Sequence, residues 1–181
     1  MRTIYLTAGH NGKGTGASSQ YGDEGEEAID VRDDVAELLQ HWGVRVRTDP
    51  NRMRLRDVLR WVSGASKNDV ICDIHFNAFN GKAHGTEVLI ANEHNYKEKQ
   101  LAQALCDRIC SDLGTYNRGV KTERQTARKR IGILSGAPRH AINVLIEICF
   151  IDNESDMQKY DENYDDLIEG IADVLCDFPT E

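Results

Sequence analysis

The fold of this chain is decided by the stretch Val70-Ile71-Cys72-Asp73-Ile74-His75. A compact run of apolar and β-branched residues of this length is typical of a buried central strand. A second run of the same kind, Ile-Asn-Val-Leu-Ile-Glu-Ile, occupies Ile142–Ile148. Further strands are expected at Ile4–Thr7, Val44–Arg47, Gly85–Ala91 and, more weakly, Ile131–Leu134.

Segments with helical periodicity separate these strands. Apolar residues recur at helical spacing from Ala28 onward, so a long helix should begin near Asp23 or Glu24 and end at Trp42. Gly43 is a natural stop for it. Further apolar stripes predict helices at Leu55–Val62, Leu101–Leu113 and Tyr164–Leu175. Strands that alternate with helices of this length indicate an α/β fold with a largely parallel sheet covered on both faces.

The composition is that of one globular domain. The chain has 181 residues, of which 40% are hydrophobic and 29% charged, and it shows no repeat, linker or low-complexity tract. We therefore treat 1–181 as a single domain. The net charge of −8 argues against a general nucleic-acid or anionic-membrane binder, which needs a basic face. Positive charge gathers in one place, between Arg118 and Arg130.

The N-terminal segment is too short and too β-branched to be a signal peptide. No apolar stretch approaches the roughly 18 residues that a membrane span needs. We therefore expect a protein that is made in the cytoplasm without a Sec-type export signal.

Polar residues mark the carboxyl ends of three predicted strands, and these residues are His10, His75 and Glu147. In open α/β sheets the ligand site lies beyond those ends. A charged or imidazole group is costly in or beside an apolar run unless something pairs with it. One binding partner shared by the three side chains at this edge explains their positions better than three unrelated causes. For Glu147 a buried salt bridge is the alternative.

Two histidines need at least one more ligand to hold zinc in a catalytic geometry, with a fourth position left for water. The candidates lie in Asp23-Glu24-Gly25-Glu26-Glu27. At about 100° per residue, Glu24 falls on the core-facing stripe of the predicted helix, Glu27 at its edge and Glu26 nearly opposite. Helical phase therefore favours Glu24 as the third ligand. Acidic residues at a helix start can also simply complement its dipole, which is our interpretation of Glu26 and Glu27.

The other residues that can bind metals are interpreted as structural. The cysteines number five, an odd count without framework spacing, which predicts reduced thiols in a cytoplasmic setting. Cys106 and Cys110 lie one helical turn apart and are expected to pack, a soft-metal or redox role being the alternative. Four histidines in polar or terminal contexts are taken as structural or surface residues: His41, His84, His94 and His140.

At these residues the sequence resembles the amidase_3 family of N-acetylmuramoyl-L-alanine amidases, which occurs among cell-wall hydrolases and phage endolysins. The resemblance runs from Ile4 to about Leu175. Five motifs in order carry it: Ala8-Gly9-His10-Asn11-Gly12, Asp73–Ala78, Gly85-Thr86-Glu87-Val88, Asn117–Lys121 and Glu147–Asn153.

Three positions depart from the family pattern. Asn11 and Cys149 each stand where glycine is usual, and Asp73 stands where serine is usual. None of the three removes a predicted metal ligand or Glu147. A cysteine at 149 could narrow the site and so alter substrate preference.

The resemblance implies a three-layer α/β/α fold with a mixed six-stranded sheet and about five or six helices. It implies a zinc ion held by His10, Glu24 and His75. The implied reaction is hydrolysis of the amide between the lactyl group of N-acetylmuramic acid and L-alanine in peptidoglycan. Glu147 would act as general acid/base, taking a proton from water and passing it to the leaving amine.

Substrate contacts are also implied. Asn77 could orient a ligand or the substrate. Arg118, Lys121 and Arg124 could meet carboxylates of the stem peptide, a solvated loop being the alternative.

Two rival functions remain at this point. One is a catalytically dead peptidoglycan-binding module, against which the retained Glu147 counts. The other is a different zinc hydrolase, such as a peptidase or deacetylase, which would release a different product. With no wall-binding domain and no signal peptide in the sequence, we expect a monomeric phage or prophage lysin that acts on the wall after release or non-Sec export.

Overall fold

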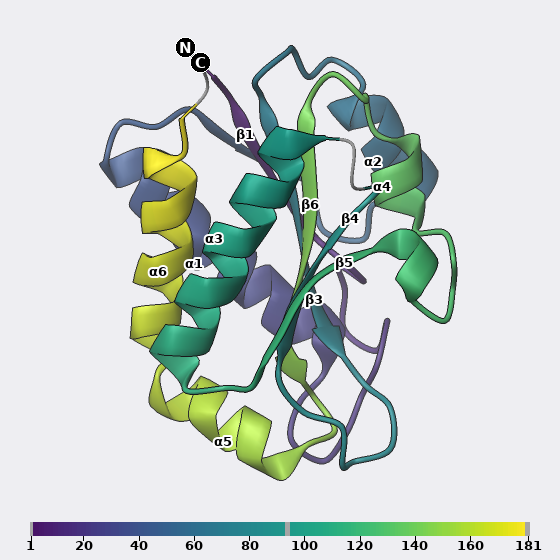
Figure 1. The fold of residues 1–181 in the computed structure, drawn as a ribbon, viewed down its shortest axis with the longest axis vertical. Coiled ribbons are helices and arrows are strands. Elements are labelled where there is room, and N and C mark those ends of the chain that lie inside the picture. The colour runs from purple at the N-terminus through teal and green to yellow at the C-terminus, as the bar shows by residue number, and fades with distance from the viewer. Residues whose placement is uncertain (1, 93–94, 180–181) are drawn as a thin grey trace.

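Six strands form one sheet in the order β2-β1-β3-β6-β4-β5 (Figure 1). The structure is a computed structural model that describes residues 2–92 and 95–179. The strands are β1 Ile4–Ala8, β2 Val46–Thr48, β3 Val70–Asn77, β4 Thr86–Ile90, β5 Asn117–Thr122 and β6 Ile142–Phe150. The predicted α/β fold with a mostly parallel, mixed six-stranded sheet is confirmed.

Strand direction changes once across the sheet. β2, β1, β3 and β6 run parallel, whereas β4 is antiparallel to β6 and parallel to β5. β4 therefore begins at the edge of the sheet where β3 and β6 end. This reversal places Glu87, near the start of β4, directly opposite Glu147 on β6.

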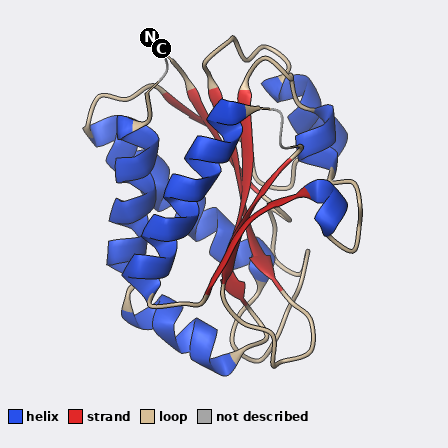
Figure 2. Cartoon of the chain, viewed as in Figure 1, coloured by secondary structure: helices blue, strands red, loops and turns tan. Residues whose placement is uncertain are grey.

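Helices cover both faces of the sheet (Figure 2). One face packs against α1 Glu24–His41, α3 Tyr96–Leu113 and α6 Tyr164–Asp177. The other face packs against the shorter α2 Leu55–Val62 and α4 Gly132–Gly136. The remaining elements are a 3₁₀ turn, η1 Glu123–Gln125, and α5 Glu154–Glu162, which follows β6. Among the described residues, none of the helices combines the length and apolarity needed to cross a membrane.

The face under α2 and α4 changes character along the strands. Near these helices it is apolar and is built from Tyr5, Ile71, Leu89 and Leu145. Side chains two residues apart on a strand share a face. The next residues on the same face are polar, namely Thr7, Asp73, Glu87 and Glu147. Polar side chains therefore gather on that half of the sheet face.

The structure differs from the sequence predictions at two elements, α4 and β5. Residues 131–134 were expected to form a weak strand, but they begin α4, which packs on α2. An apolar run of four residues does not distinguish a strand from a buried helix turn. The strand that completes the sheet is instead β5, which was not predicted. Its polar sequence Asn-Arg-Gly-Val-Lys-Thr carries no alternating apolar pattern.

The remaining differences concern the ends of two helices and one helix that was not predicted. α1 ends at His41, and Gly43 has a φ of 78°, as expected for a left-handed stop. α3 begins at Tyr96, earlier than predicted, because the Asn95 side chain caps it by accepting a hydrogen bond from the Glu98 backbone. α5, which follows β6, was not predicted.

Candidate active site

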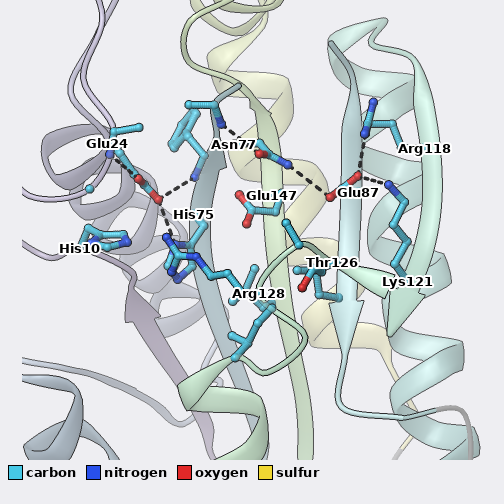
Figure 3. Close-up of a pocket in the computed structure, with 18 of the residues that line it drawn as sticks. His10, Glu24, His75, Asn77, Glu87, Arg118, Lys121, Thr126, Arg128 and Glu147 are labelled. Atoms are coloured by element: carbon cyan, nitrogen blue, oxygen red, sulfur yellow. Dashed lines mark hydrogen bonds and ion pairs between the residues drawn. The ribbon is translucent and has the colours of Figure 1, made fainter. Parts of the chain in front are cut away.

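A cavity of about 730 Å³ lies over the polar half of the sheet face (Figure 3). Residues of β3, β4 and β6 form part of its lining, together with the start of α1 and the segment 125–131 after β5. The cavity therefore lies where the parallel strands end and where β4 begins.

Three side chains converge at one side of this cavity. His10 comes from the turn after β1, Glu24 from the first turn of α1 and His75 from β3. One possible ligand atom from each lies within 4.8 Å of the other two. His75 Nδ1 is 2.9 Å from Glu24 Oε1, and the two imidazole rings stand edge to face with centroids 5.4 Å apart. The structure thus brings together the three residues that the sequence predicted as metal ligands.

Glycines allow the three side chains to approach so closely. A Cβ on Gly9 would lie 2.0 Å from the His75 ring, and one on Gly16 would lie 2.4 Å from Glu24 Oε2. His10 itself has a φ of 55°, a left-handed conformation that costs a non-glycine residue about 1 kcal/mol or more. Backbone strain of this kind is concentrated at functional sites.

The charges of this group fit a metal ion. Glu24 is 4% exposed, and burial raises the pKa of its carboxyl, but His75, the Ala17 backbone N–H and His10 together outweigh burial and leave that pKa below its usual value. Burial lowers the pKa of His75, yet Asp73 and Glu24 raise it well above the usual value overall. Two imidazoles and one carboxylate, with room beside them, are the donor set of a catalytic zinc site.

Glu147 lies next to this group on β6, paired in register with His75 on β3. Its Oε2 atom is buried and has no hydrogen-bond partner among the described residues. Burial raises the pKa of the Glu147 carboxyl to about 8; the charges of Glu24 and Glu87 push the pKa the same way and His75 opposes them. A carboxyl that can hold or release a proton near neutral pH suits a general acid/base.

Glu87 forms a polar network on the other side of Glu147. Its Oε2 accepts hydrogen bonds from Arg118 Nε at 2.6 Å and Lys121 Nζ at 2.5 Å, and its Oε1 accepts one from Asn77 Nδ2 at 3.2 Å. Burial raises the pKa of Glu87, but the two cations outweigh it and lower the pKa overall. Sequence reasoning did not assign Glu87 a role, although a charged residue inside the apolar strand Thr-Glu-Val-Leu-Ile was a usable signal.

The basic segment after β5 contributes one arginine to the cavity, and it is not the predicted one. Arg124 is exposed and does not line the cavity, whereas Arg128 does. Burial lowers the pKa of His10, and the positive charge of Arg128 is one of the groups that lower it further. Arg128 was recognised in the sequence only as part of the basic cluster.

The family model described as N-acetylmuramoyl-L-alanine amidase (Amidase_3) matches residues 4–177. The chain belongs to this amidase family. Membership covers nearly the whole chain and includes all the residues of the cavity described above.

Two relatives and one solved structure illustrate what the chain is similar to. The uncharacterized protein YqiI of Bacillus subtilis (strain 168) is 29% identical over 162 residues, which is 87% of this chain and 74% of the relative. An uncharacterized cell wall amidase of Bacillus anthracis is 29% identical over 177 residues, 88% of this chain but only 32% of the relative's length. The crystal structure of N-acetylmuramoyl-L-alanine amidase from Clostridium difficile 630 has a TM-score of 0.81 at 24% identity, covering 97% of this chain and 95% of that one. The last comparison shows the shared fold.

Two departures from the amidase family pattern are structural. The Asn11 side chain is buried and donates to Asp49 Oδ2 at 2.6 Å, which ties the turn after β1 to the buried Arg32–Asp49 ion pair. Cys149 lies in the core with its Sγ 3.8 Å from Met157 Sδ and does not line the cavity. It therefore does not narrow the site.

The histidines outside the site have structural or surface positions. His140 Nε2 is 2.7 Å from the Ala65 carbonyl oxygen, and His84 Nδ1 is 3.2 Å from that of Lys82. His41 is exposed at the end of α1, and residue 94, a histidine, lies outside the described residues.

The two other acids of the first helical turn also lie away from the cluster. Glu26 pairs with Lys13 at 3.0 Å on the surface, and Glu27 accepts a hydrogen bond from the Tyr160 hydroxyl at 3.0 Å. Helical phase therefore separated Glu24 from its acidic neighbours correctly.

Proposed function

We propose that this chain hydrolyses the amide between the lactyl group of N-acetylmuramic acid and L-alanine in peptidoglycan. In this proposal His10, Glu24 and His75 hold a zinc ion and Glu147 is the general acid/base. The observation that carries the proposal is the convergence of three possible ligand atoms within 4.8 Å, beside a carboxyl with a buried, unpartnered oxygen. Membership of the amidase family supports the choice of substrate.

The mechanism assigns one task to each group. When bound, zinc supplies Lewis acidity that lowers the pKa of water and polarises the scissile carbonyl. Glu147 takes a proton from the attacking water on its carboxylate and delivers it to the leaving nitrogen of L-alanine. Since Glu147 Oε2 has no hydrogen-bond partner in the described part of the chain, it can accept this proton without breaking another hydrogen bond.

Product analysis tests the function. Purified protein incubated with peptidoglycan or a defined muropeptide should release new L-alanine amino groups and no new reducing sugar, because the glycan chain stays intact. A chelator should stop the release, and added zinc should restore it. New reducing ends would identify a glycosidase, cleavage elsewhere in the peptide a different zinc hydrolase, and binding without any product a non-catalytic module.

Arg128 is the cation that we propose for a carboxylate of the stem peptide. Its side chain is exposed in the cavity lining, and among the described residues no carboxylate pairs with it. Arg118 and Lys121, by contrast, are both held by Glu87, so a substrate carboxylate would have to compete with Glu87 for them.

Arg128→Ala should raise KM for a muropeptide about tenfold with little change in kcat, as expected for the loss of one charge-assisted hydrogen bond. Steady-state kinetics measures this, with the exposed neighbour Lys129 as the control in Lys129→Ala. If Arg124→Ala raises KM and Arg128→Ala does not, the original assignment of Arg124 holds and the segment adopts another conformation with substrate.

A further inference from the structure

Asp73 and His75 lie on the same face of β3, and Asp73 contacts the ring nitrogen of His75 that does not face Glu24. Asp73 Oδ2 lies 2.9 Å from His75 Nε2. The other oxygen, Oδ1, accepts a hydrogen bond of 2.5 Å from the hydroxyl of Thr7, which is its register partner on β1. Asp73 is 6% exposed. Both carboxylate oxygens are therefore engaged in a buried position, so the side chain has one orientation.

This contact determines which nitrogen of His75 would keep its hydrogen when a metal ion ligates the ring. An ionised carboxylate only accepts hydrogen bonds, so Nε2 can donate to Asp73 and Nδ1 can donate to Glu24. A metal ion on Nδ1 would replace the hydrogen there and leave the Nε2 hydrogen bonded to Asp73. The nitrogen left to face the ligand cluster is Nδ1, which lies 2.9 Å from Glu24 Oε1. Turning the ring over would put carbon atoms in place of both nitrogens and break both contacts.

Gly9 leaves the room that the His75 ring needs. A Cβ at Gly9 would lie 2.0 Å from His75 Nε2 and 2.0 Å from Cε1, so any larger residue at this position would displace the ring. The contacts of Nε2 with Asp73 and of Nδ1 with Glu24 fix which way the ring is turned. Its Nδ1 atom is thereby directed toward Glu24 and His10.

We propose that Asp73 is a positioning residue, which holds His75 as the Nε2–H tautomer and presents Nδ1 as the metal-ligating atom. This proposal rests on the proposed zinc site. A carboxylate behind a ligating histidine fixes the tautomer and makes the ligand more basic, and its loss typically costs 10–100-fold in metal affinity. A serine hydroxyl, usual at this position in the family pattern, can either donate or accept and would not impose one tautomer.

A merely structural role for Asp73 is the alternative, since it also joins β3 to β1 through Thr7. Asp69 offers a matched control for that role. It is a buried aspartate whose two oxygens accept from the Thr3 and Ser66 backbone, at the opposite end of the same strand pair and away from the cavity.

Zinc affinity, measured by competition with a chromogenic chelator, separates the two roles. Asp73→Ser and Asp73→Asn should weaken zinc binding about 10–100-fold. Asp69→Asn should leave zinc affinity unchanged even where thermal unfolding shows lost stability. If folded Asp73 variants bind zinc as tightly as the parent chain, the positioning role is wrong.

Side-chain ¹⁵N NMR of the zinc-loaded parent chain gives a second and independent readout, which decides the case even if the variants do not fold. We expect His75 to show a metal-bound Nδ1 and a protonated Nε2. A metal-bound Nε2 would overturn the proposal. A parent chain that takes up no zinc would instead contradict the zinc site itself, so the two failures are distinguishable.

Discussion

Glu147→Ala should keep its zinc and its fold and lose turnover by about a hundredfold or more, the usual contribution of a general acid/base. Glu147 lies beside the three proposed ligands but is not one of the group whose ligand atoms converge. Removing it therefore takes away the proton carrier and leaves the metal donors in place. Release of L-alanine amino groups, elemental analysis and circular dichroism measure the three expectations.

A buried glutamate outside the cavity provides the control. Glu98 on α3 also contacts β6, through the backbone and side chain of Asn143, but it does not line the cavity. Glu98→Ala should lower stability and leave the activity per folded molecule unchanged. If Glu147→Ala digests peptidoglycan as well as the parent does, the mechanism is wrong, and if it loses zinc, Glu147 is a ligand and not the base.

His75→Ala and Glu24→Gln should each lose zinc and, with it, nearly all activity. A catalytic site with three protein ligands binds about one zinc per chain, and removing one ligand leaves only two. His75 and Glu24 are the central pair of the cluster, 2.9 Å apart. Zinc content after dialysis against zinc-replete and then zinc-free buffer is the measurement.

Matched variants check that the loss is specific. His140→Ala and Glu26→Gln should both retain zinc, because His140 bonds to the Ala65 carbonyl and Glu26 pairs with Lys13 on the surface. Retention by Glu24→Gln together with loss by Glu26→Gln would mean that the first turn of α1 is rotated relative to the structure described here.

Much of the fold follows from local pattern. Buried parallel strands such as β3 and β6 are near-continuous apolar runs, and α1 carries a regular stripe with a glycine stop, so all three were predictable. β5 was not, because its stability comes from pairing with β4 and from ion pairs to Glu87 and not from its own apolar residues. α4 was mistaken for a strand because its short apolar run acquires a helical form by packing on α2.

The site divides in the same way. Helical phase and the positions of strand ends were enough to predict that Glu24 lies beside the two histidines. The contact of Asp73 with His75 depends on side-chain rotamers, and the choice of Arg128 over Arg124 depends on the path of an irregular segment, which periodicity does not encode. Glu87 is a different case. The sequence shows its charge within an apolar strand, but it does not show that Arg118 and Lys121 pair with it.

The order of strands in the sheet also sets the order in which the site can assemble. All three proposed ligands have been synthesised once residue 75 is reached, and β1 then has both of its sheet neighbours, β2 and β3. β4 cannot join them, because β6 lies between β3 and β4 in the sheet. Pairings between distant parts of a chain form late. We therefore expect a growing chain to bring the three proposed ligands together first and to lack the proposed general acid/base until β6 pairs with β3.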